Sequence, residues 1–293
     1  MSSTTLKLIA LLFMIIDHIA EYIPGAPIWF HWIGRVSAPI FFFCMAWGFY
    51  YTHNRKRYLL RLYLCGVIMA IINVILQNIF RLGIHNNIFV TLFLSALLIY
   101  IFDTIKENRK KGIRMLIGLI LWQIVNTCIL VLLFDVAGIY FNKYMDENFY
   151  TAIFANCILN EGGIMFVLLG ILFYYSKDNK LKLAITYIGF SFIYTILYAT
   201  NIAARILLVF KGFHLKIIYN MLQIILCGIL QVNFFPKYGI PFYTIINYYW
   251  MIIGALPFLI LYNNKRGKGL KYFFYLFYPI HIYLLYIIGN LIS

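Results

Sequence analysis

The chain alternates between long apolar runs and short polar breaks. A helix that crosses the roughly 30 Å hydrocarbon core of a bilayer needs about 20 apolar residues, and most of these runs reach that length. The pattern predicts an all-α polytopic integral membrane protein, with about nine or ten transmembrane helices in one bundle and a single domain over residues 1–293. The expected spans lie at about 5–23, 33–52, a third ending near 80, 86–104, 115–140, 151–175, 183–203, 215–235, 241–262 and 271–291.

Basic residues in the short loops predict the orientation of the spans. Four bases lie in 53–61, five in 106–114 and three in 177–182. Because loops rich in lysine and arginine stay in the cytoplasm, these loops and the N-terminus are expected on that side. Strict alternation would then put the segment NNKRGKGLK (263–271) outside, although it carries four bases. Either a run near 205–240 is re-entrant or interfacial, or the late loop departs from the charge rule.

The composition excludes a soluble fold and argues against a nucleic-acid partner. Apolar residues make up 64% of the chain and charged residues only 11%, against about 25% charged in soluble domains. The net charge of +15 comes from bases clustered in loops, so we expect membrane lipids as partners and no nucleic acid. The five cysteines lie inside apolar runs without metal-ligand spacing, so neither a disulfide nor a bound metal is expected.

Ionisable residues occur where the spans should meet lipid. Asp17, His18 and Glu21 lie in the outer half of the first span, Arg35 opens the second, and His281 lies inside the last. Each such group costs several kcal/mol to insert, so together they indicate a functional site. Others within spans or near their ends are Glu161, Asp135 and Arg205. The amides expected as interhelical hydrogen-bond partners are Asn73, Gln77, Gln123, Asn126, Asn160, Gln223 and Asn247.

Helical spacing predicts which of these groups meet. Glu21 follows His18 by three residues and can therefore contact it on one face of the helix. Asp17 points about 100° away, and Arg35 is its expected partner once the short turn EYIPGAPIWFHW folds the second span back. The alternative is that these charges only hold helices together or reach toward lipid headgroups.

Any chemistry must take place within the membrane, because the motifs of soluble enzymes are missing. The sequence contains no GxSxG, no Walker loop, no HExxH and no dinucleotide fingerprint. A histidine is the natural general base in such a site, since its side chain gains and loses a proton near neutral pH.

Four segments together resemble a known family. They are TTLKLIALLFMIIDHI, WIGRVSAPIFFFCMAWGFYYTHNRKRYLLRLY, NNIFVTLFLSAL and LKYFFYLFYPIHIYLLY, which carry the IDH, GR…P, YLLRL and YPxH elements in this order. The combination resembles the TraX family of conjugal-transfer membrane proteins, known for the acetylase of conjugative pilin. That family is similar to the acyltransferase family 3 group of ten-span membrane enzymes. The likeness covers about the first hundred and last twenty-five residues, with EGGIMFVLLGILFYY between them.

The resemblance implies an acyl-CoA-dependent acyltransferase, most simply an acetyltransferase, in a bacterial cytoplasmic membrane. Acyl-CoA (acetyl-CoA) would be the co-substrate, and the acceptor would be a protein N-terminus, a glycan or a lipid. Lys7 stands eleven residues before His18, where the wider group has an arginine. Arg57 and Arg61 lie in RKRYLLRL, which is similar to that group's arginine-rich stretch, and would meet the CoA phosphates.

These observations favour an enzyme in which His18 is the general base, oriented by Glu21 or by a carboxylate from another helix. Lys7 or Arg35 would stabilise the oxyanion, and Tyr278 and His281 would complete the site from the last span. Two other classes stay open: a transporter that uses the buried charges as a relay, and a non-catalytic assembly factor. For His281 the alternative is a packing contact in a helix kinked at the neighbouring Pro279.

Overall fold

The computed structural model describes residues 1–80, 84, 86–132, 147–158, 160–200, 202–212, 215–232 and 248–292. Within this part of the chain the secondary structure is helical, without strands. Seven helical segments of this part, with Phe30–Tyr51 counted as one, are long and apolar enough to cross a membrane. The prediction of an all-α polytopic membrane protein is therefore confirmed.

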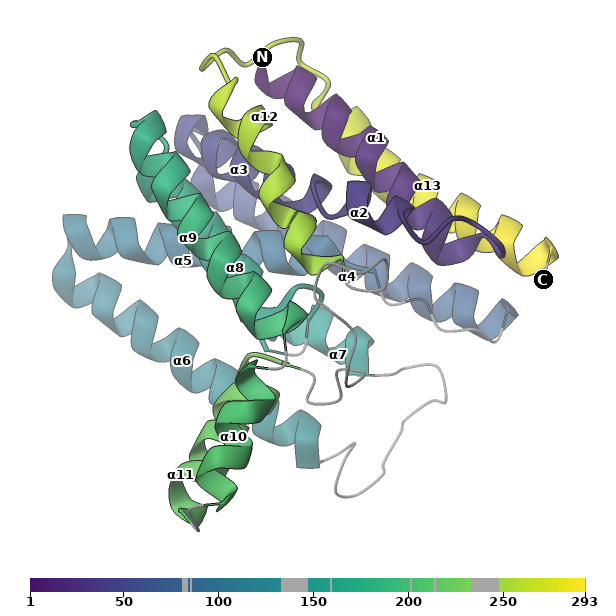
Figure 1. Cartoon of the computed structure of the whole chain (residues 1–293). Helices are drawn as coiled ribbons and strands as arrows, with labels where there is room; N and C mark the ends of the chain where they lie inside the picture. Colours follow the sequence, from purple (N-terminus) through teal and green to yellow (C-terminus); the bar gives the residue numbers. More distant parts are fainter. Residues whose placement is uncertain are drawn as a thin grey trace. The chain divides into compact units, whose positions relative to one another are not determined.

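The helices follow one another as shown in Figure 1. They are α1 (Ser3–Tyr22), α2 (Phe30–Gly34), α3 (Ser37–Tyr51), α4 (Arg55–Phe80), α5 (Ile88–Glu107), α6 (Arg109–Val131), α7 (Glu147–Phe154), α8 (Gly163–Ser176), α9 (Lys180–Ala199), α10 (Ile202–Gly212), α11 (Lys216–Gln223), the π-helix η2 (Ile224–Ile229), the 3-10 helix η3 (Tyr249–Ala255), α12 (Leu256–Ile260) and α13 (Lys271–Ile292).

Seven of the expected spans correspond to long helices, and three correspond to shorter apolar ones. The shorter helices cover Gly163–Ser176, Lys216–Ile229 and Tyr249–Ile260. The expected span at 151–175 is wrong as a single helix, because α7 ends at Phe154 and α8 begins only at Gly163. Parts of two other expected spans, 133–140 and 241–247, lie outside the described residues.

The break between α7 and α8 has a backbone cause. Ala155, Gly162 and Gly163 have φ values of 50°, 79° and 54°, which the interior of a right-handed helix cannot contain. Side chains of α6 bond the freed backbone, since Gln123 Nε2 donates to the Ala155 carbonyl at 2.9 Å and Gln123 Oε1 accepts from the Cys157 N–H at 2.8 Å. A broken helix is tolerated at bilayer depth when protein groups satisfy its backbone in this way.

Other expected amide contacts have mixed outcomes. Asn126 accepts a hydrogen bond from Asn156 in the break, which confirms it, like Gln123, as a partner between elements. Asn73 and Gln77 donate to carbonyls in the segment before α5. Asn160 has no partner among the described residues, Gln223 is exposed, and Asn247 lies outside the described residues.

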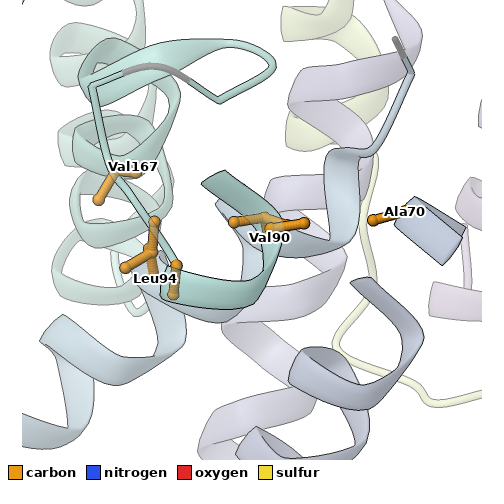
Figure 2. Close-up of a cluster of buried hydrophobic side chains, with 6 residues drawn as sticks. Ala70, Val90, Leu94 and Val167 are labelled. Atoms are coloured by element: carbon orange, nitrogen blue, oxygen red, sulfur yellow. The ribbon is translucent and has the colours of Figure 1, made fainter. Parts of the chain in front are cut away.

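The chain divides into two compact units. The first contains Met1–Cys44 and Tyr175–Ser293, and the second contains Met45–Tyr174, so that α3 runs through the boundary. In the second unit, α4, α5, α7 and α8 share an apolar cluster that includes Ala70, Val90, Leu94 and Val167 (Figure 2). A single domain over residues 1–293 stays a prediction.

At one end of the second unit, Asp103 connects three helices. Arg55 donates to Asp103 Oδ2 at 2.7 Å and to the Tyr174 hydroxyl at 3.1 Å, while that hydroxyl donates to the same carboxylate oxygen at 2.6 Å. These bonds gather the start of α4, the end of α5 and the end of α8. The basic segments 53–61 and 106–114 therefore lie at the same end of this unit.

In the first unit, α1 and α13 run side by side in the same direction (Figure 1). Lys7 lies over the ring of Phe274, with Nζ 5.3 Å from its centroid, and further along the two helices the ring centroids of Tyr22 and Tyr286 are 5.8 Å apart. From the first contact to the second, the residue numbers increase in both helices, so α1 and α13 are parallel. The beginning of α13 therefore lies at the same end of this unit as the N-terminus.

The late basic segment is bonded to the beginning of α1. The Ser3 N–H donates to the Lys265 carbonyl at 2.8 Å, and the Thr4 N–H and hydroxyl donate to the Arg266 carbonyl at 3.1 and 3.0 Å. The Thr4 hydroxyl also reaches the Lys268 carbonyl at 2.6 Å. The bases of this segment thus lie on the side of the N-terminus, as the charge rule requires.

This arrangement bears on how many times the chain crosses the membrane between α9 and the late basic segment, and so on the side at which that segment lies. The end of α9 and the beginning of η3 lie together, with the rings of Tyr194 and Tyr249 6.0 Å apart, while Tyr187 near the start of α9 bonds the Ile252 carbonyl. Helix α9 is therefore antiparallel to η3 and α12. At 1.5 Å per residue, α10 with its 11 residues spans only about 16 Å, and it packs against α11. This geometry favours the alternative in which α10 and α11 are re-entrant or interfacial.

A labelling experiment tests this topology. In a variant whose five cysteines are replaced by alanine, a cysteine introduced at Lys268 should resist a membrane-impermeant maleimide in intact cells, because its segment lies with the N-terminus, which the charge rule predicts to be cytoplasmic. A cysteine introduced at Ile28, in the exposed turn after α1, is the matched control and should be labelled. Labelling at position 268 in intact cells would contradict the topology.

Candidate functional site

Two histidines from opposite ends of the chain meet in the first unit. His18 of α1 and His281 of α13 are joined by a hydrogen bond of 2.8 Å between His18 Nδ1 and His281 Nε2. Their rings are stacked, with centroids 5.0 Å apart and an angle of 23° between the ring planes. Only 6% of His18 and 7% of His281 is exposed. The structure thus brings together two residues that the sequence places 263 positions apart.

The hydrogen bonds fix the tautomers of this pair when both rings are neutral. His281 Nδ1 lies 2.8 Å from the Phe277 carbonyl, which can only accept, so Nδ1 carries the hydrogen. His281 Nε2 must then accept, and His18 Nδ1 donates to it. His18 Nε2 is left with an unprotonated lone pair, as a general base requires.

The hydrogen-bond partner of His18 in the structure is His281, whereas the sequence predicted a carboxylate in this place. Glu21 Oε2 lies 3.8 Å from His18 Nε2, which confirms their contact but is too long for a hydrogen bond. The Glu21 side chain is 39% exposed near the end of α1.

Asp17, on another face of α1, binds two residues of the neighbouring segment. Its Oδ2 accepts from Arg35 Nη2 at 3.2 Å, which confirms the predicted pair. Its Oδ1 accepts from His31 Nδ1 at 2.7 Å. His31 was missed by the sequence analysis. It precedes Arg35 by four residues, and this spacing, which puts two helical residues on one face, was the signal that could have found it.

A close approach of backbone allows these bonds. A Cβ atom on Gly34 would lie 2.2 Å from Asp17 Cγ, so only glycine lets α2 come this near to α1. Before α2, the turn contains Gly25 with a φ of 78°, a conformation that glycine adopts without strain.

Aromatic side chains complete the surroundings of these charges. The Arg35 guanidinium lies 4.9 Å from the ring centroid of Tyr248, and the His31 ring stacks on the same ring at 5.0 Å. Tyr278 is buried, with its ring 5.9 Å from that of His281 in an edge contact. The site is therefore built from α1, α2, α13 and the residue preceding η3.

Of the other candidate residues, Lys7 lies further along α1, and two arginines belong to the second unit. Helix α1 is continuous, so Lys7 lies about 16 Å from His18 along the axis, and its expected role as an oxyanion partner at His18 is not possible without a large rearrangement. Lys7 stays a candidate contact for a distant part of an extended donor. Arg57 is exposed and Arg61 lies over the Tyr58 ring at 5.8 Å, both in the second unit.

The remaining ionisable candidates have different surroundings. Glu161 lies in the break before α8 and accepts from the Asn87 N–H. Arg205 is exposed on α10, and Asp135 lies outside the described residues. The described residues contain no group of three His, Cys, Asp or Glu side chains that could hold a metal ion.

Comparison with known protein families identifies the relatives of this chain. A family model described as TraX protein matches residues 2–221. The chain belongs to the TraX family. No curated protein and no solved structure matches it. The TraX match includes Asp17, His18, His31 and Arg35 but ends before α13, so the family match itself does not include His281, which the sequence predicted and the structure brings to His18.

The approach of α2 to α1 can be tested at Gly34. Gly34→Ala should lower the thermal unfolding midpoint of the detergent-purified protein by several degrees, because the new methyl group would overlap Asp17. Gly189→Ala is the matched control, since a Cβ there meets nothing within 4 Å on α9 and alanine favours a helix. Equal midpoints for Gly34→Ala and wild type would contradict the described packing.

Proposed function

We propose that this TraX-family protein is a membrane-embedded acyltransferase. It moves an acyl group, most simply acetyl, from cytoplasmic acyl-CoA to an amine or hydroxyl of an envelope or secreted acceptor. The observation that carries the proposal is the hydrogen-bonded pair of His18 and His281, which leaves a basic nitrogen on His18 beside the charges of Asp17 and Arg35.

In the proposed reaction, His18 Nε2 takes the proton from the acceptor amine or hydroxyl. The nucleophile adds to the thioester carbonyl, whose π electrons move onto oxygen. The carbonyl then reforms as the bond between carbon and sulfur breaks, with its electron pair leaving on sulfur. As Nε2 gains its proton, His18 can pass the proton on Nδ1 to His281 along their 2.8 Å hydrogen bond.

Arg35 is the cation best placed to stabilise the oxyanion. Its guanidinium is held by Asp17 and by the face of Tyr248, and its Nε is buried without a hydrogen-bond partner among the described residues. A fixed donor of this kind stabilises developing charge without reorganisation during the reaction.

The donor and acceptor are proposed from charge and from family likeness. The basic segment beside the N-terminus suits the phosphates of acetyl-CoA, and Lys7 lies between that segment and His18. Arg57 and Arg61 are further candidates through the likeness of RKRYLLRL to acyltransferase family 3. A pilin-like protein N-terminus, a glycan or a lipid at the bacterial cytoplasmic membrane would supply the acceptor group.

The first test measures transfer itself. Purified protein supplied with radiolabelled acetyl-CoA and an envelope fraction from its host should label an acceptor. His18→Ala should lower the rate by about a hundredfold or more, the usual contribution of a general base. His53→Ala, at an exposed histidine of the second unit, is the matched control and should leave the rate unchanged. A transporter or an assembly factor would transfer no label, and transfer persisting in His18→Ala would remove His18 as the base.

The second test concerns His281. His281→Ala should lower the same rate by about tenfold to a hundredfold, less than His18→Ala, because it removes the partner of the base rather than the base. The measurement is the initial rate at saturating acetyl-CoA, with the thermal midpoint checked in parallel. An undiminished rate in His281→Ala would reduce His281 to a packing residue.

A further inference from the structure

His31 is held by contacts that fix its ring orientation. Its Nδ1 lies 2.7 Å from Asp17 Oδ1, and because a carboxylate accepts, this nitrogen carries a hydrogen. The ring stacks on Tyr248 with centroids 5.0 Å apart and planes 29° from parallel. A histidine bonded through Nδ1 to a carboxylate presents Nε2 as its reactive nitrogen.

The Nε2 atom of His31 is available for proton transfer. Among the described residues, no hydrogen bond engages this atom, and the His31 side chain is 20% exposed while that of His18 is 7% exposed. A bound molecule can therefore reach His31 more readily than His18.

The two imidazoles have different partners although they belong to one site. Asp17 and His18 are consecutive residues of α1, so the groups they bind lie at one depth along this helix. His18 is hydrogen-bonded to a second imidazole, whereas His31 is hydrogen-bonded to a carboxylate. Two titratable groups in unlike environments are the arrangement by which a site separates its base from its acid.

The proposed acyl transfer needs an acid as well as a base. When the bond between carbon and sulfur breaks, negative charge develops on sulfur in a region of low dielectric, where an unpaired charge is costly. Arg35 can attract this charge but cannot release a proton to it. His31 is bonded to the same carboxylate as Arg35 and can release one.

We infer that His31 is a second catalytic residue, the general acid that protonates the departing thiolate of the acyl donor. The inference rests on the proposed function. In the imidazolium form, Nδ1–H stays with Asp17 and Nε2–H faces the sulfur. As the bond between carbon and sulfur breaks, its electron pair takes this proton, the free thiol leaves, and His31 becomes neutral. The proton that His18 gained from the acceptor balances the one that His31 gave.

Two acyl donors with different leaving groups can show whether His31 acts as a general acid or only holds α2 against α1. Acetyl-CoA releases an alkyl thiolate that needs protonation, whereas the acetyl thioester of nitrothiophenol releases a stable aryl thiolate that does not. His31→Asn keeps an amide donor near the position of Nδ1, and so can keep the bond to Asp17, but it has no group that transfers a proton.

With acetyl-CoA, His31→Asn should transfer acetyl to the envelope fraction about a hundredfold more slowly than wild type. With the aryl thioester, its transfer rate should lie within about threefold of the wild-type rate. Rates are corrected for the reaction without protein. His18→Asn should be slow with both donors, and His53→Asn, at the exposed control histidine, should match wild type with both.

Three results would overturn the inference. Equal losses with both donors would make His31 a residue that only positions α2, and unchanged rates with both would remove it from the reaction. A wild-type protein that uses neither donor would refute the proposed function and this role with it, whereas the first two results would leave the proposed function intact.

Discussion

The carboxylate of Asp17 makes the interaction on which the rest of the site depends. At bilayer depth an aspartate or an arginine alone is costly, and pairing the two offsets much of that cost. Asp17 binds Arg35 through one oxygen and His31 through the other, and so fastens α2 to α1. The next residue is His18, which points to α13 and meets His281. One pair of consecutive residues therefore joins three elements around a polar centre.

The sequence predicted the members of this centre that stand within apolar runs. Asp17, His18, Arg35 and His281 are conspicuous because lipid surrounds their segments, and the pairing of Asp17 with Arg35 follows from the short turn between spans. His31 was missed because a histidine in an aromatic turn near a span end is ordinary at a membrane interface. The bond between His31 and Asp17 depends on the close approach of α2 to α1 that Gly34 allows, and this approach is not evident from the sequence.

Other features could not be predicted because they depend on backbone conformation or on pairing between distant segments. Residues 155–162 contain Asn156, Asn160 and Glu161 between apolar residues, but no hydropathy pattern reveals the positive φ of Ala155. The side of the late basic segment was undecided because it depends on hydrogen bonds to Ser3 and Thr4, more than 250 residues earlier. Local sequence patterns show which residues are costly to place in lipid, whereas tertiary contacts determine which partners offset that free energy.

The pairing of α1 with α13 also has a consequence for biosynthesis. Helix α1 leaves the ribosome well before α13, which supplies His281 263 positions later, so the histidine pair cannot form until α13 has been translated and inserted. Until then, His18 must be accommodated by lipid, by other spans or by the insertion machinery. A nascent TraX chain therefore holds His18 without His281 while the helices between α1 and α13 are being inserted.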